Sequence, residues 1–366
     1  MIKSLQSLRF YIILLIFVTH LFFIQNIPVL SNIYSKYFSN GAIGVTFFFI
    51  LSGFVIRLGY GEKFKKITLK TYFNFIKKRI IKIYPIYIIS IIIMFVFLQY
   101  LSSFEISHLI SNIKKLILCI SLIQTLIPIQ DINQSFNGAA WFLSSLFIIY
   151  LCTPFLLHLN YKNKDSLKSN IIKMFIIYVI YIILLFIILK FVGDKYKISL
   201  MYCSPFLRIF QYYLGILLAN IYLLFKDKHK SNNSLLEIVS IILFLILFIF
   251  TPTISKKIGS ILNIDYLSTM ISYSIYIFIS LFTIYIFSFD KGIISKFLSN
   301  SINLYLGNIS FYIYIIHLPL IEITYHFLVK YKLFITPIYY FLPIVYLIST
   351  IGLSILYKYI YSKIVK

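Results

Sequence analysis

Apolar stretches of about 20 residues recur along almost the whole chain, and this pattern constrains its fold more than any other feature. A helix needs about 20 mostly apolar residues to cross the hydrocarbon core of a bilayer. We therefore predict an all-α integral membrane protein, with about ten transmembrane helices in a single bundle. The predicted helices are Leu5–Ile27, Ile43–Leu58, Ile80–Leu101, Ala139–His158, Ile171–Phe191, Pro205–Phe225, Leu235–Phe250, Tyr266–Phe287, Leu304–Val329 and Pro337–Tyr359.

The chain has a large excess of positively charged residues. Lys and Arg number 34 against 10 Asp and Glu, a formal net charge of +24, while 61% of the residues are hydrophobic and only 12% are charged. A soluble globular domain has roughly twice that share of charged residues. The composition excludes that class, and with it a soluble nucleic-acid binder, so we predict no nucleic acid among the partners. The basic residues belong in loops beside an anionic lipid bilayer.

An eleventh apolar stretch, Leu116–Ile129, is shorter, contains Gln124 and ends near Pro128. Short loops rich in Lys and Arg stay on the cytoplasmic side of a membrane. If this stretch does not cross, four such loops lie on one side together with both termini. We therefore predict that it is a re-entrant or interfacial segment and that both termini are cytoplasmic. The four loops are Lys63–Lys82, Lys162–Lys168, Lys226–Lys230 and Lys291–Lys296.

The chain shows no internal repeat and no soluble appendage, so we expect residues 1–366 to form one membrane domain. Cys119, Cys152 and Cys203 lie in apolar surroundings, without the spacing of a disulfide framework or a zinc site. We expect no bound metal. The Lys-rich and Ile-rich composition is compatible with an AT-rich bacterial genome, which favours a bacterial plasma membrane.

Ionisable side chains inside membrane helices are costly, and they usually mark functional sites. Arg9 and His20 share the first predicted helix and lie on one face of it, about 16 Å apart along the axis. An imidazole at membrane depth could take a proton from a hydroxyl, whereas a guanidinium could hold an anion. A snorkelling arginine and a histidine bonded to a neighbouring helix would explain the same spacing. The residues alone leave both explanations open.

The chain has only four arginines among its 34 basic residues, and the other three are Arg57, Arg79 and Arg208. Arg79 and Lys82 lie on one face at the cytoplasmic end of the third predicted helix. These two cations would suit the phosphates of a cytoplasmic donor, although lipid-headgroup anchoring is the alternative. Gly44 and Gly53, in the second helix, are small residues typical of close helix packing.

Three further residues are candidates for an acceptor contact or for a structural role. Arg208 lies near the outer end of the sixth predicted helix, and His317 lies inside the ninth. Trp141 begins the fourth helix, where an interfacial anchor is favoured over a sugar-stacking platform.

Six motifs in this order resemble the integral-membrane acyltransferase family 3, and the similarity spans nearly the whole chain. The motifs are Arg9-x10-His20, Gly44-Val-Thr-Phe-Phe-Phe-Ile-Leu-Ser-Gly53-Phe54, Arg79-Ile-Ile-Lys82-Ile-Tyr84-Pro85-Ile-Tyr87, Ala140-Trp141-Phe-Leu-Ser-Ser-Leu-Phe-Ile-Ile-Tyr150-Leu-Cys-Thr-Pro154, Ser204-Pro205-Phe-Leu-Arg208-Ile-Phe-Gln211-Tyr-Tyr-Leu-Gly215 and Leu306-Gly-Asn-Ile-Ser310-Phe-Tyr-Ile-Tyr314-Ile-Ile-His317-Leu-Pro319.

The resemblance implies a ten-helix core that transfers acetyl or other short acyl groups, usually from acyl-CoA, to hydroxyls of glycans or lipid-linked glycans. It implies that His20 is the catalytic residue, that Arg9 is its partner, and that Arg79 occupies the first basic position of the third-helix motif. The chain departs from the family at Lys82, where many relatives have Arg, and at Gln211, which is acidic in many relatives. Many relatives also have a Glu after the Trp-x-Leu-Ser motif, and a mechanism that requires this carboxylate is not supported here.

We therefore expect a membrane O-acyltransferase that uses acetyl-CoA, or another acyl-CoA, as donor substrate and has no bound cofactor. The acceptor would be a cell-surface or lipid-linked glycan. One alternative is a transporter or flippase of a lipid-linked saccharide, with Arg9, His20 and Arg208 lining its path. A structural partner in a polysaccharide-assembly complex is a third class, and it would need no histidine within the membrane.

Overall fold

The computed structural model describes residues 2–38, 40–103, 105–162, 166–229, 231–264, 266–332 and 338–364. Helices make up most of this part of the chain, and no strand occurs in it. The α-helices are α1 (Lys3–Thr19), α2 (Pro28–Tyr37), α3 (Ala42–Tyr60), α4 (Leu69–Leu101), α5 (Ile106–Ile120), α6 (Gln130–Asn133), α7 (Trp141–Lys162), α8 (Leu167–Phe191), α9 (Asp194–Ile198), α10 (Pro205–Phe225), α11 (Ser234–Leu262), α12 (Leu267–Phe287), α13 (Ile293–Leu298), α14 (Ser301–Lys330) and α15 (Ile338–Ile364).

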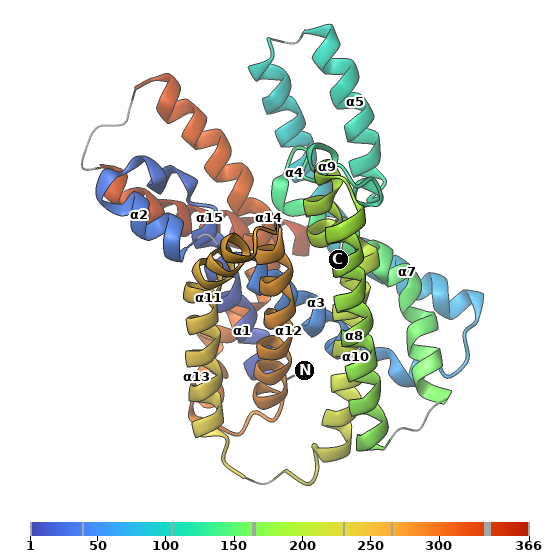
Figure 1. The fold of residues 1–366 in the computed structure, drawn as a ribbon. Coiled ribbons are helices and arrows are strands. Elements are labelled where there is room, and N and C mark those ends of the chain that lie inside the picture. The colour runs from blue at the N-terminus through green and yellow to red at the C-terminus, as the bar shows by residue number, and fades with distance from the viewer. Residues whose placement is uncertain are drawn as a thin grey trace.

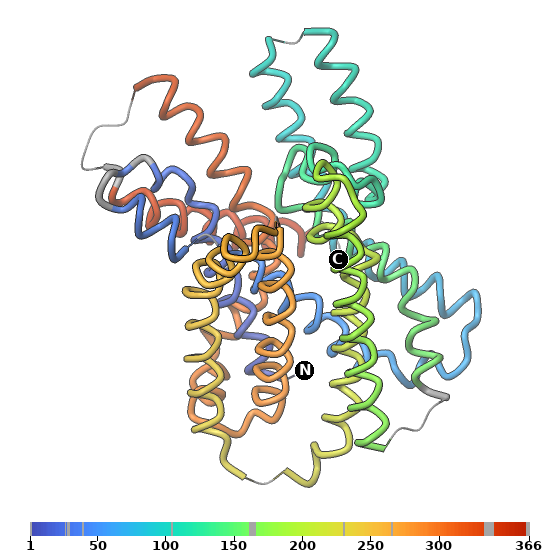
Figure 2. Tube along the Cα trace, viewed as in Figure 1, coloured from blue at the N-terminus to red at the C-terminus, as the bar shows by residue number. Residues whose placement is uncertain are grey.

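Within the described residues, nine helical segments are long and apolar enough to cross a membrane. α1 adds a tenth long apolar helix of 17 residues. It packs against α14 and α3 inside the bundle, as the blue N-terminal segment of Figure 2 shows. The predicted all-α membrane bundle is therefore confirmed. The predicted start of the last helix, Pro337, lies outside the described residues.

The helices alternate so that the lysine-rich loops gather at one end of the bundle, which we call the lysine-rich end. There the start of α1 meets the end of α12, because Ser4 Oγ donates to the Phe287 carbonyl at 2.6 Å. The His158 ring near the end of α7 contacts the carbonyl of Phe64 after α3 at 3.2 Å. Lys230 and residues 163–165, in two of these loops, lie outside the described residues.

The first helix is shorter than the sequence predicts. The expected helix Leu5–Ile27 stops at Thr19, and His20 caps it with its own N–H bonded to the carbonyls of the last turn. The hydroxyl of Tyr34 donates to the Thr19 carbonyl at 2.8 Å, which satisfies a carbonyl that the ending helix leaves free. A short 3₁₀ turn follows at Phe22–Asn26. Apolar residues continue past the break, so hydropathy alone could not locate it.

None of the nine helical segments that could cross a membrane includes Leu116–Ile129, and its re-entrant or interfacial arrangement stays a prediction. α5 folds back along α4, and the Tyr87 hydroxyl of α4 donates to the Cys119 carbonyl at 2.7 Å. Figure 1 shows α4 and α5 as a hairpin that projects from the top of the bundle. The chain then returns through the turn Gln124–Leu126 and α6 to the start of α7, at the end opposite the lysine-rich end.

Two glycines bring α3 and α10 into backbone contact. A Cβ atom on Gly53 would lie 1.9 Å from the Tyr212 carbonyl oxygen, and one on Gly215 would lie 1.9 Å from that of Ile50. Both distances are far below van der Waals contact, so any side chain at either position forces the two helices apart. The predicted packing role of Gly53 is confirmed, and it fits the use of small residues where membrane helices approach closely.

We predict that Gly53→Ala lowers the apparent melting temperature of the purified protein by several degrees, because overpacking costs about 1–3 kcal/mol. Gly59→Ala is the matched control in the same helix, since a Cβ atom there meets no atom within 4 Å. The control should be neutral or slightly stabilising, because alanine favours helix more than glycine does. Equal melting temperatures for the two variants would contradict this account of the α3–α10 contact.

Candidate active site

A cavity of about 340 Å³ lies between α1, α3, α4, α7 and α14. Three of the predicted site residues, Arg9, Arg79 and Lys82, line it, and we call it the basic cavity. Most of the remaining lining is apolar or aromatic, including Phe142 and Tyr314. The arrangement combines a cluster of positive charge with a mostly apolar lining.

The arginines of the basic cavity are held by neutral groups. Arg79 Nη2 donates to the Tyr60 hydroxyl at 2.7 Å, and its guanidinium carbon lies 5.0 Å from the centroid of that ring. The Nε of Arg79 is buried without a hydrogen-bond partner. Arg9 Nη1 donates to Gln6 Oε1 at 3.3 Å. No ion pair between described residues reaches Arg9, Arg79 or Lys82, so their charge is available to an anionic ligand.

His20, at the end of α1, and His317 of α14 form a pair. His20 Nδ1 lies 3.1 Å from His317 Nε2 and 3.0 Å from the Ile16 carbonyl oxygen. His317 Nδ1 lies 2.8 Å from the Tyr314 carbonyl oxygen. A carbonyl only accepts hydrogen bonds, so the proton of His317 is on Nδ1 and its Nε2 accepts. His20 then carries its proton on Nδ1, and its Nε2 is left with a free lone pair.

Tyr314 separates the basic cavity from the histidine pair. Its side chain lines the cavity, and its ring centroid lies 5.9 Å from that of His317. The Tyr314 hydroxyl donates to the Ala139 carbonyl at 2.8 Å, which fixes the ring between α14 and the start of α7. Neither histidine lines the cavity itself. His317 is fully buried, whereas His20 is half-buried.

Arg208 lies apart from both features, in a cage of aromatic rings. Its side chain is 1% exposed, and its guanidinium carbon lies between 5.1 and 5.7 Å from four ring centroids. Nη1 donates to Gln211 Oε1 at 2.8 Å, Nε donates to the Tyr202 carbonyl at 2.7 Å, and Nη2 has no partner. The four rings belong to Phe49, Trp141, Tyr202 and Tyr273.

Trp141 is therefore not the interfacial anchor that its place at the start of a helix suggested. Its side chain is 3% exposed and packs against Tyr202, with ring centroids 4.6 Å apart. A position at the start of a membrane helix indicates a lipid–water boundary only if no other segment covers it. Here the turn Ser199–Cys203 covers Trp141 through the ring of Tyr202. The turn is held against α7 because the Ser145 hydroxyl donates to the Cys203 carbonyl.

The structure divides the predicted site residues into three groups. Arg9 joins Arg79 and Lys82 at the basic cavity, His20 joins His317, and Arg208 joins Trp141. The pairing of the two histidines was missed by sequence reasoning, because they are 297 positions apart and belong to separate motifs. Tyr150, which lines the basic cavity and stacks near Arg79, was missed as one of many tyrosines.

The helical bundle and its basic cavity define a membrane protein with a site between its helices. The family model described as an acyltransferase domain matches residues 2–359. The chain therefore belongs to acyltransferase family 3, as its motifs predicted. No curated protein and no solved structure matches the chain. In the described part of the chain, no group of three or more His, Cys, Asp or Glu side chains could hold a metal ion.

The aromatic cage yields a stability prediction. Arg208→Lys should lower the apparent melting temperature by several degrees, because lysine cannot reproduce the planar hydrogen bonds to Tyr202 and Gln211. Gln211→Glu should not lower it, because the buried guanidinium forms no ion pair with any described carboxylate and would gain one. Thermal unfolding in detergent measures both changes. An equal fall in melting temperature in the two variants would contradict the view that the Arg208 charge lacks a counter-ion.

Proposed function

We propose that this family 3 acyltransferase transfers an acetyl group from acetyl-CoA to a hydroxyl of a cell-surface or lipid-linked glycan, in a bacterial plasma membrane with both termini in the cytoplasm. The observation that carries the proposal is the basic cavity. Its three cations lie on helices that start or end at the lysine-rich end, and its apolar part extends to Tyr314, beside the histidine pair. Such a cavity suits a donor with anionic phosphates and a short, uncharged acyl end.

In this proposal the phosphates of the donor contact Arg9, Arg79 and Lys82. Arg79 has an unpartnered Nε and already stacks on Tyr60, so its guanidinium is oriented before the donor binds. Preorganised charge-assisted hydrogen bonds to phosphate are among the stronger polar contacts in proteins. The pantetheine arm follows the apolar lining, where water is excluded from the thioester.

His20 acts as the general base. Its Nε2 takes the proton of the acceptor hydroxyl while the hydroxyl oxygen forms a bond to the thioester carbonyl carbon. The carbon–sulfur bond then breaks, and the CoA thiolate leaves with the proton that His20 held. The products are the acetyl ester and free CoA. His317 is a positioning residue, because its Nε2 accepts from His20 Nδ1 and fixes the tautomer that leaves His20 Nε2 basic.

A route in which His20 briefly carries the acyl group uses the same nitrogen. It differs in producing an acyl-enzyme that rapid quenching and mass spectrometry would detect. Either route requires His20, so the first test addresses the residue rather than the intermediate.

We predict that His20→Ala abolishes acetylation, a loss of at least about 100-fold, because the hydroxyl loses its base. The measurement is the base-labile acetyl content of surface glycans, by mass spectrometry, at matched expression of the protein. His326→Ala is the control, since His326 contacts Phe97 and lies outside the site. Full activity of His20→Ala would falsify the mechanism. Normal acetylation with less surface glycan in a deletion strain would favour the transporter instead.

The donor contacts give a second prediction. Arg79→Ala and Lys82→Ala should each raise KM for acetyl-CoA by about 10-fold or more, because a hydrogen bond to a charged group contributes about 1.5–3 kcal/mol. The maximal rate should change less. Lys77→Ala and Lys78→Ala are matched controls, since both lysines are exposed on the same helix and do not line the cavity. Equal KM values in all four variants would show that the donor phosphates do not contact Arg79 and Lys82.

A further inference from the structure

A second cavity, of about 550 Å³, lies in the hairpin formed by α4, α5 and α6, and we call it the hairpin pocket. Unlike the basic cavity, it is lined mainly by polar side chains of mixed character. The lining consists of Leu98, Asn112, Lys115, Gln130, Asp131, Gln134, Ser135 and Phe136. None of these residues lines the basic cavity.

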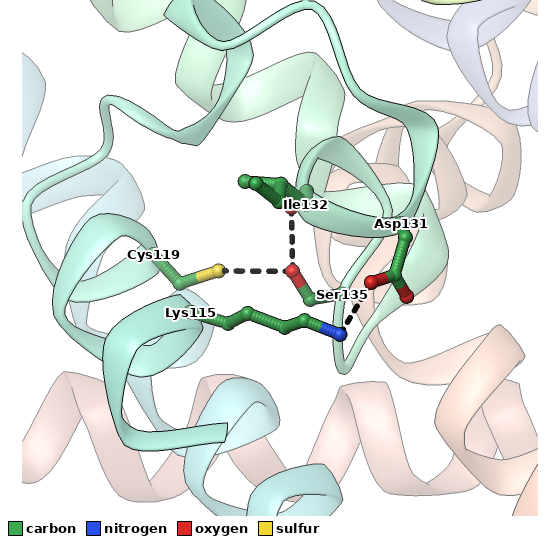
Figure 3. Close-up of polar contacts among 5 residues, drawn as sticks. All are labelled: Lys115, Cys119, Asp131, Ile132 and Ser135. Atoms are coloured by element: carbon green, nitrogen blue, oxygen red, sulfur yellow. Dashed lines mark hydrogen bonds and ion pairs between the residues drawn. The ribbon is translucent and has the colours of Figure 1, made fainter. Parts of the chain in front are cut away.

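Figure 3 shows how two walls of the hairpin pocket are joined. Lys115 of α5 and Asp131 of α6 form an ion pair of 2.6 Å between Nζ and Oδ2. The Ser135 hydroxyl donates to the Ile132 carbonyl and lies 3.9 Å from the sulfur of Cys119. These contacts tie α6 and the segment after it to α5, so the pocket has a defined shape.

The polar groups of the hairpin pocket match a hydroxyl-rich, uncharged ligand. Asn112, Gln130 and Gln134 bring three amide groups to the lining, and an amide can bond a hydroxyl as donor or as acceptor. Gln130 Nε2 donates to Gln134 Oε1 at 3.3 Å, and each of these two amides keeps further bonding capacity for a ligand. The single cation is already neutralised by Asp131, so the pocket has no net charge to attract a phosphate. Leu98 and Phe136 add an apolar surface. A sugar ring presents this combination of hydroxyls and apolar C–H groups.

α5 has two opposite faces, and their arrangement sets the surroundings of the pocket. Asn112 and Lys115 face the pocket, whereas an exposed row of isoleucines faces away from it. A row of this kind on a membrane protein requires apolar surroundings, which lipid chains provide. α5 therefore lies between the pocket and the lipid. The row consists of Ile106, Ile110, Ile113, Ile117 and Ile120.

The chain that follows the wall of the hairpin pocket contacts α14 close to His317. Asn137 follows the lining residue Phe136, and its Nδ2 donates to the Ile315 carbonyl of α14 at 2.9 Å. Two residues later, the Ala139 carbonyl accepts from the Tyr314 hydroxyl at 2.8 Å. These contacts fall in the turn of α14 that bears His317. The chain that leaves the hairpin pocket at Phe136 thus contacts the short part of α14 whose Tyr314 lines the basic cavity.

We propose that the hairpin pocket binds a sugar unit of a lipid-linked glycan acceptor, with its lipid beside the isoleucine row of α5. This inference rests on the proposed function and names the acceptor site for it. The basic cavity supplies the acyl donor from the lysine-rich end, and the hairpin pocket holds the acceptor at the opposite end. The reacting hydroxyl must then reach His20, whose partner His317 lies on the turn of α14 that Asn137 and Ala139 contact.

The test compares three proteins at matched expression. The first is the wild type, and the second is the double variant Asn112→Ala, Gln134→Ala, which removes two amides from the pocket. The third is the control Ser111→Ala, Lys114→Ala, which changes exposed neighbours on α5 outside the pocket. Two quantities are measured: the base-labile acetyl content of lipid-extracted glycan, by mass spectrometry, and the affinity of each purified protein for acetyl-CoA.

We expect the pocket variant to lose at least about 10-fold of the lipid-linked acetyl content and to keep wild-type affinity for acetyl-CoA, with the control unchanged in both. Unchanged acetylation in the pocket variant would overturn the inference alone. A parallel loss of acetyl-CoA affinity would also overturn it, because the amides would then serve the fold. Acetyl groups found only on polymer free of lipid would exclude the lipid-linked acceptor. A wild type that binds no acetyl-CoA would overturn the proposed function itself.

Discussion

The backbone contact between α3 and α10 is the constraint on which the rest of the structure depends. Gly53 and Gly215 allow the helices to approach so closely that neither position tolerates a Cβ atom. This approach brings Phe49 of α3 onto the guanidinium of Arg208 of α10, 5.5 Å from its ring centroid. α3 in turn forms a wall of the basic cavity through Phe48 and Ser52. A wider separation would disturb the aromatic cage and the cavity together.

The cage around Arg208 illustrates how a membrane protein can bury a charge without a carboxylate. Four rings and two hydrogen bonds replace the counter-ion, and cation–π contacts are strongest where water is excluded. Gln211 accepts one hydrogen bond from Arg208 and donates another to the Tyr181 hydroxyl at 3.2 Å. The cage holds α10 against Trp141 at the start of α7, next to the Ala139 carbonyl that accepts from the Tyr314 hydroxyl.

Much of the fold could be predicted from the sequence, because about 20 apolar residues in a row have few alternatives to a membrane helix. The cluster of Arg9, Arg79 and Lys82 was also predictable, since all three lie near the lysine-rich end. The break at His20 was not predictable, because the residues after it remain apolar. The His20–His317 contact was not predictable either, since it depends on the packing of α1 against α14. Trp141 was misjudged for the same reason: tertiary neighbours decide what an aromatic side chain meets.

The early end of α1 has an electrostatic consequence for His20. The peptide dipoles of a helix sum to a partial negative charge at its C-terminus, which favours a cation there by about 0.3–1 kcal/mol even at a solvated surface. The His20 ring lies at this point, 3.0 Å from the Ile16 carbonyl oxygen. An imidazolium formed during proton transfer would therefore be stabilised by the helix that carries it. In an uninterrupted helix through Ile27, the same histidine would lie mid-helix, where the peptide dipoles cancel.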